Sequence, residues 1–201
     1  MARRQIIQKK KPLIVICSEG GKKSSEYYYF RNFASRDLRI QFSTGNSTDP
    51  EGMFKELRKY IKNEDIASED EVTIFLVLDT DLDSKKERII KELKNQSISY
   101  KIEIITSAPT FEIWYLMHLR NNRLVFSSSK EVKNELGTIL GSYTETMDLY
   151  KKIYDKTNEA KALAKKLEQD AIDADQDIIS KNPHTDIYKI IEVIEKYNKS
   201  K

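Results

Sequence analysis

The sequence has little of what builds disulfide-bonded, secreted or membrane-spanning proteins. Its single cysteine, Cys17, excludes an intramolecular disulfide and is typical of a reducing compartment. No apolar run reaches the roughly 20 residues of a transmembrane helix, and the first residues lack the apolar stretch of a secretory signal. The glycine, lysine and hydroxyl spacing of a P-loop is also missing. We therefore expect a cytoplasmic protein with no membrane partner, and any ATPase that works with it would be a separate chain.

The chain also lacks a strong excess of either charge. It has 35 lysine and arginine residues against 32 aspartate and glutamate residues. The small positive excess comes from residues 1–12, where the basic side chains have no acidic neighbour. This basic leader either contacts phosphates or is a solvated segment, and the sequence leaves both open. The body shows no basic stripe of the kind that follows a nucleic-acid duplex.

Short apolar runs alternate with amphipathic segments over residues 13–108. The runs are too short for buried helices and are typical of strands: 13–18, 38–43, 72–78 and 100–106. Between them, helices are expected from about Ser24, from Asp49-Pro50, and after residue 83, where Ser84 and Glu87 have capping-box spacing. This order predicts an α/β fold with a parallel sheet and helices on both faces. Residues 109–201 have a helical pattern and form an expected helical extension packed on that core.

The acidic stretch Asp79, Asp81 and Asp83 follows the most apolar of these runs. Glu19 follows the first run, and the two groups can meet if their strands are neighbours in the sheet. Carboxylates that emerge together repel one another, so the fold needs a cation or a positively charged partner there. The alternative is a polar turn that caps the next helix.

A second group of polar residues surrounds Glu19. Gly20 and Gly21 permit positive φ and close backbone approach, and Lys22 and Lys23 add charge that suits a phosphate. Glu26 falls in the first turn of the next helix, where capping and metal contact are equally good explanations.

Two polar residues interrupt an apolar segment after Pro109. Glu112 is either paired with a cation at the strand edge or lies on an exposed helix edge. His118 is more often a structural histidine than a ligand at such a position.

Four segments together resemble the RloB family, which is associated with bacterial abortive infection and restriction loci and has a divergent Toprim domain. They are IVICSEGGKKSSEYYYF, FLVLDTDLD, SAPTFEIWYLMH and NPHTDIYKII, and they span about residues 12–197. The resemblance implies that Glu19, Asp79 and Asp81 are the catalytic and Mg²⁺-binding (or Mn²⁺-binding) acids, with Asp83 as an auxiliary ligand. Ser25 stands where family members usually have threonine. The same motifs contain Glu112, Trp114 and His118, to which the resemblance gives no clear role.

Two functions are compatible with this pattern. The first is a Mg²⁺-dependent nuclease of an anti-phage defence system, which acts on nucleic acid together with a separate AAA-type or ABC-type ATPase. The second is a non-catalytic subunit that binds nucleic acid or the ATPase. A phosphate-accepting receiver domain is a weaker third interpretation.

Overall fold

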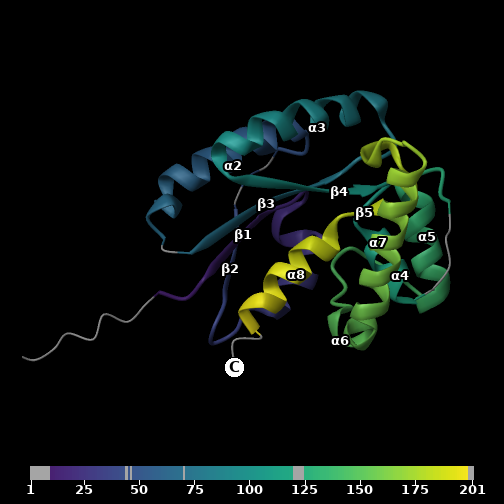
Figure 1. Cartoon of the computed structure of the whole chain (residues 1–201). Coiled ribbons are helices and arrows are strands. Elements are labelled where there is room, and N and C mark those ends of the chain that lie inside the picture. The colour runs from purple at the N-terminus through teal and green to yellow at the C-terminus, as the bar shows by residue number, and fades with distance from the viewer. Residues whose placement is uncertain (1–9, 44, 46, 70, 120–124, 199–201) are drawn as a thin grey trace, which may run out of the picture.

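The computed structural model describes residues 10–43, 45, 47–69, 71–119 and 125–198, and contains one five-stranded sheet in the order β2-β1-β3-β4-β5 (Figure 1). The strands are β1 (Leu13–Cys17), β2 (Arg39–Phe42), β3 (Val72–Asp79), β4 (Ile102–Ala108) and β5 (His184–Thr185). The first four are parallel, and β5 pairs antiparallel with β4. The predicted α/β class and its four parallel strands are confirmed, whereas the basic leader lies mostly outside the described residues.

Helices cover both faces of the sheet, as the sequence predicts. One face packs against α2 (Pro50–Asn63) and α3 (Ser84–Ser97). The other packs against α1 (Ser25–Phe30), α4 (Glu112–Leu119), α5 (Ser129–Leu140), α6 (Tyr150–Ile153), α7 (Thr157–Asp173) and α8 (Ile187–Asn198). Short 3-10 turns connect these elements: η1 (Gly21–Lys23), η2 (Arg31–Phe33), η3 (Ile66–Ser68), η4 (Ile98–Tyr100), η5 (Tyr154–Lys156) and η6 (Ile178–Ser180). Part of this second layer is the helical extension, which shares one hydrophobic core with the sheet.

Side chains at the helix starts fix where the helices begin. Ser24 caps α1, close to where a helix is expected to begin, and Asp49 caps α2 as expected. The predicted capping box at Ser84 and Glu87 is wrong, because the cap of α3 lies one residue earlier. The cap is Asp83, whose Oδ1 accepts the backbone amide hydrogens of Lys85 at 2.8 Å and Lys86 at 3.3 Å.

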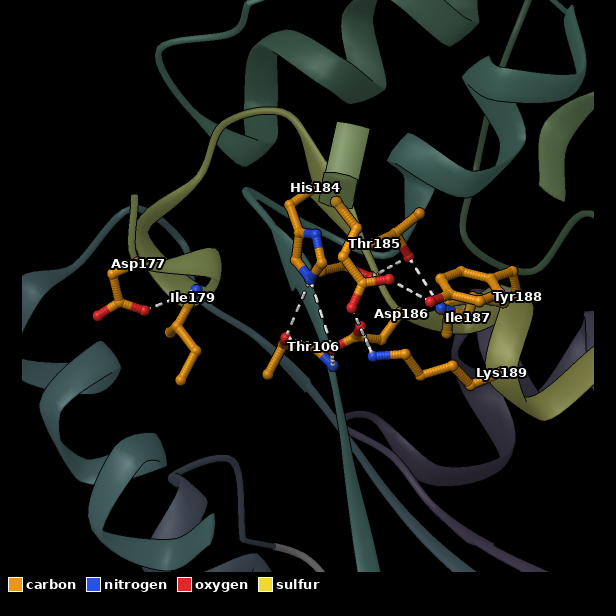
Figure 2. Close-up of polar contacts among 11 residues, drawn as sticks. Thr106, Asp177, Ile179, His184, Thr185, Asp186, Ile187, Tyr188 and Lys189 are labelled. Atoms are coloured by element: carbon orange, nitrogen blue, oxygen red, sulfur yellow. Dashed lines mark hydrogen bonds and ion pairs between the residues drawn. The ribbon is translucent and has the colours of Figure 1, made fainter. Parts of the chain in front are cut away.

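A buried ion cluster ties β5 and α8 to β4 (Figure 2). Asp186 is 2% exposed, and its carboxylate accepts hydrogen bonds from the Thr106 hydroxyl at 2.9 Å and the Lys189 ammonium at 2.6 Å. His184 Nε2 lies 3.4 Å from the same carboxylate. Burial opposes ionisation of Asp186, but His184 and Lys189 overcome it and hold its pKa well below the ordinary value. The sequence segment NPHTDIYK thus anchors the C-terminal helix.

Within the described ranges, no helix is long and apolar enough to cross a membrane.

Candidate metal centre at the strand ends

The candidate site lies where β1 and β3 end side by side. The two strands are parallel and in register from Leu13 with Val72 to Cys17 with Leu76, so the residues that follow them emerge at one edge of the sheet. A pocket of about 190 Å³ opens there. Its acidic lining residues come from four separate parts of the chain: Glu19, Glu26, Asp79, Glu112 and Glu145. The predicted meeting of Glu19 with the end of β3 is therefore present.

The inner part of the pocket holds three carboxyl groups, two on buried residues and one on the half-buried Asp79. Glu26 from α1 is 5% exposed, Glu112 at the start of α4 is 2% exposed, and Asp79 is the last residue of β3. The Thr110 hydroxyl connects two of them, lying 2.8 Å from Asp79 Oδ2 and 2.6 Å from Glu112 Oε2. Glu112 is therefore a buried residue of the site and does not lie on an exposed helix edge, which was the alternative open from the sequence.

Burial and mutual repulsion make it unfavourable to ionise this group together. Burial, followed by repulsion from Glu112, raises the pKa of Glu26 to about 8. Burial raises the pKa of Asp79 well above its ordinary value, with further contributions from Glu26 and Glu112. The hydroxyl geometry agrees, because Thr110 has one hydrogen and two carboxyl oxygens within reach, so the second contact needs a proton on a carboxyl group. Without a cation, at least one carboxyl group of the inner site carries a proton.

Hydroxyl groups hold Glu112 in place from the opposite side. Ser25 and Tyr143 each donate to Glu112 Oε1, at 2.7 and 2.8 Å, and their oxygens lie 2.8 Å apart. Tyr143 comes from the segment between α5 and α6, and Lys133 and Glu145 of the same helical extension line the pocket. Burial, followed by the nearby charge of Glu112, raises the pKa of Tyr143 far above its ordinary value, and the residue therefore acts as a neutral donor.

The acids in the outer part of the site are already paired with a lysine. Lys86, in the first turn of α3, donates to Glu19 Oε1 at 2.7 Å and to Asp81 Oδ2 at 2.8 Å. The other oxygen of Asp81 accepts a hydrogen bond from Ser129, the first residue of α5, at 2.6 Å. Burial opposes ionisation of Asp81, but the hydrogen bonds from Lys86 and Ser129 lower its pKa. For Glu19, burial prevails over Lys86, and its pKa is raised.

The other predicted site residues have different positions. Gly20 and Gly21 have positive φ values of 71° and 53°, as expected, and Gly20 lines the pocket. Lys22 and Lys23 are exposed on η1. Asp83 caps α3, and its role as an auxiliary ligand stays a prediction.

His118 lies in the aromatic core of the extension. Its Nδ1 is 2.7 Å from the carbonyl oxygen of Trp114, and its ring packs edge-on against the Trp114 ring. Burial lowers its pKa to about 4, so the imidazole is neutral. His118 is not among the described residues that line the pocket.

Whether the pocket suits a divalent cation depends on its oxygen atoms. Within the described ranges, no three acidic, histidine or cysteine side chains are arranged to hold an ion as they stand. Mg²⁺ commonly uses only one or two carboxylates, together with waters and substrate phosphates. Asp79 Oδ1 is buried and has no hydrogen-bond partner in the described part of the chain, and its neighbours resist joint ionisation. The donor set therefore fits Mg²⁺ or Mn²⁺ at Asp79.

Sequence reasoning missed the basic and hydroxyl residues of the site. Lys86 could have been found, because a helix that begins just after the acidic strand end directs its first turn towards that end. Lys133, which lines the pocket from α5 and pairs with Glu145 at 2.5 Å, follows Ser129 by one helical turn. Tyr143 gave no sequence signal, since its place depends on how the extension folds back.

Comparison with known proteins agrees with the resemblance described above. The model of a family described as RloB-like protein matches residues 14–194. Searches of curated proteins and of solved structures gave no match.

Proposed function

The chain belongs to the RloB-like family, and on that premise we propose that it is a Mg²⁺-dependent or Mn²⁺-dependent nuclease of a bacterial anti-phage defence system. The observation that supports this most directly is Asp79 Oδ1, which has no hydrogen-bond partner among the described residues and lies in a pocket of carboxyl groups that resist joint ionisation. When bound, a divalent ion supplies Lewis-acid polarisation of the phosphate and activates the attacking water. Asp79 would be the principal ligand, with Glu26 and Glu112 beside it.

The chain's own residues then position and move the remaining groups. Glu19 lies at the rim, where its carboxylate serves as a ligand or accepts a proton from water. The water oxygen forms a bond to phosphorus as the bond to the leaving oxygen breaks. One water proton passes to the leaving oxygen, and the other stays on the new phosphate end. Ser25, Tyr143 and Thr110 keep Glu112 oriented through this step.

Few phosphate anchors surround the pocket, so we propose that a separate AAA-type or ABC-type ATPase delivers the substrate. Lys22 and Lys23 are exposed beside Gly20, and Lys133 is already paired with Glu145. The isolated chain is therefore expected to cut DNA or RNA weakly or not at all.

A non-catalytic subunit is the second candidate, and one observation favours it. Lys86 already forms ion pairs with Glu19 and Asp81, so these acids have a partner without any metal. Such a protein would bind nucleic acid or the ATPase and retain the acids for structure.

A cleavage assay paired with calorimetry separates the two functions. Purified chain, with and without its partner ATPase, is incubated with labelled single-stranded and double-stranded DNA and RNA in Mg²⁺, Mn²⁺ or EDTA. The nuclease predicts cutting that EDTA stops and that Glu19→Gln abolishes without a change in the circular dichroism spectrum. It also predicts that Asp79→Asn weakens Mn²⁺ binding. Equal Mn²⁺ affinity in wild type and Asp79→Asn would refute the nuclease. It would also be refuted if no substrate were cut and Glu19→Gln protected cells from phage as well as wild type does.

A further inference from the structure

Two carboxylates of the site, Asp79 and Asp81, differ in whether their oxygens already have hydrogen-bond partners. Asp79 Oδ1 lacks a hydrogen-bond partner within the described ranges, whereas both oxygens of Asp81 accept short hydrogen bonds. The residues are two apart in the sequence, yet one faces the inner pocket and the other is 45% exposed beside α3 and α5. A single ion at Asp79 therefore leaves Asp81 already satisfied.

Lys86 occupies the position between Asp81 and Glu19. Its ammonium lies 2.7 Å from Glu19 Oε1 and 2.8 Å from Asp81 Oδ2, and the side chain is only 13% exposed. Phosphoryl-transfer sites with two metal ions place both cations between carboxylates so that they contact the attacking and leaving oxygens. In this chain the ammonium group of Lys86, a cation that belongs to the protein itself, lies between two such carboxylates, Glu19 and Asp81.

The geometry around Asp81 holds this arrangement in place. Asp81 and Leu82 both have positive φ, at 52° and 58°, in a turn closed by the hydrogen bond from the Asp83 amide to the Thr80 carbonyl oxygen at 3.0 Å. Asp83 then caps α3, which fixes the helix turn that bears Lys86. The lysine is therefore positioned by the same turn that positions its carboxylate partner.

We propose that Lys86 supplies the charge of a second cation, so that the chain uses one divalent ion together with this ammonium group. An ammonium group has three hydrogens, and the two carboxylates use two of them. The third contacts a non-bridging oxygen of the scissile phosphate and stabilises the charge that develops there, with no proton transferred from the lysine. This inference rests on the nuclease proposed above and specifies its metal stoichiometry.

Titration calorimetry of metal-stripped protein with Mn²⁺ tests the inference without any substrate. Wild type is expected to bind about one ion per chain, and Lys86→Met about two, since the freed Glu19 and Asp81 become ligands. Lys86→Met combined with Asp81→Asn should return to about one ion. Lys85→Met is the matched control, because Lys85 is the exposed neighbour on the same helix turn. Lys86→Arg retains the charge and should also bind one ion.

Cleavage provides a second readout. Lys86→Met should cut about 10²-fold more slowly at the Mn²⁺ concentration that saturates wild type, and should recover partly at higher Mn²⁺. Methionine retains the length of the buried stem, and Lys86→Gln serves the same comparison if the methionine variant does not fold.

The outcomes distinguish failure of this inference from failure of the nuclease itself. No Mn²⁺ binding by wild type would refute the metal site and with it the proposed function. Two ions in wild type, one ion in Lys86→Met, or a second ion in Lys86→Arg would overturn the role of Lys86 while leaving the nuclease intact.

Discussion

Glu26 offers a quantitative test of whether the inner pocket is a cation site. Its pKa is raised from 4.5 to about 8 in the folded protein, chiefly by burial and then by Glu112. The folded state therefore binds a proton more tightly than the unfolded chain does. Stability from this group is fully present below about pH 4.5 and is lost as pH rises to about 8. Each pH unit in that interval lowers the free energy of unfolding by roughly 1.4 kcal/mol, for a total on the order of 5 kcal/mol.

Glu26→Gln removes this dependence while preserving the shape of the side chain. In EDTA, we expect the wild-type free energy of unfolding to fall between pH 5 and pH 8, and that of the variant to fall much less. Because the variant also removes a charge near Asp79, it should be the more stable protein at pH 8. Adding Mg²⁺ at a hundred times the wild-type Kd should raise the wild-type free energy of unfolding by about 2.7 kcal/mol at pH 8. The variant should gain less.

Urea denaturation followed by circular dichroism at four pH values provides the measurement. Glu92→Gln is the control, because Glu92 is exposed on α3. Parallel pH profiles for wild type and Glu26→Gln would refute the reasoning, since they would show that Glu26 ionises in the folded state as easily as in the unfolded chain. A wild type that Mg²⁺ does not stabilise would instead argue against the cation.

Two further predictions concern parts of the chain outside the pocket. Deleting Met1 to Lys11 should weaken nucleic-acid binding and reduce its salt slope by about one unit for each lost phosphate contact, as measured by fluorescence anisotropy; an unchanged slope would make the leader a solvated segment. Asp186→Ala leaves Thr106 and His184 without their buried acceptor, whereas Lys189 keeps an ion pair with Glu168 at 3.0 Å. The variant should therefore lower the free energy of unfolding by about 1–3 kcal/mol in urea denaturation, and no measurable change would show that the cluster does not anchor α8.

The sheet could be predicted because its strands have a local signature. Residues 13–17 and 72–78 are continuous apolar runs, and both faces of a central parallel strand are buried. The two-residue strand β5 could not be predicted, because His184 and Thr185 are polar and pair with β4 only after the helical extension has folded back. Its partners, Ser107 and Ala108, are some 80 residues away in sequence.

The positions of the acids at the site could be predicted for a related reason. The residues that form hydrogen bonds and ion pairs with these acids could not. Strand ends show where Asp79 and Glu19 must emerge, so their neighbourhood follows from topology alone. Whether a carboxylate has a partner depends on side chains from other elements. Lys86 and Ser129, which satisfy Asp81, come from two different helices, and Tyr143 approaches Glu112 across 31 residues of sequence.

The contribution of the helical extension to the site has a mechanistic consequence. Ser129, Lys133 and Tyr143 all lie in the extension and contact or surround the acids of the sheet edge. A partner protein that shifts α5 would change the hydrogen bond to Asp81 and the position of Lys133 at the same time, because both residues lie one turn apart on that helix. Lys133 is paired with Glu145 at 2.5 Å, so under the proposed nuclease function such a shift would free this basic group for a phosphate. Under the delivery by an ATPase that we proposed above, control of the site would therefore require movement of one helix and no rearrangement of the sheet.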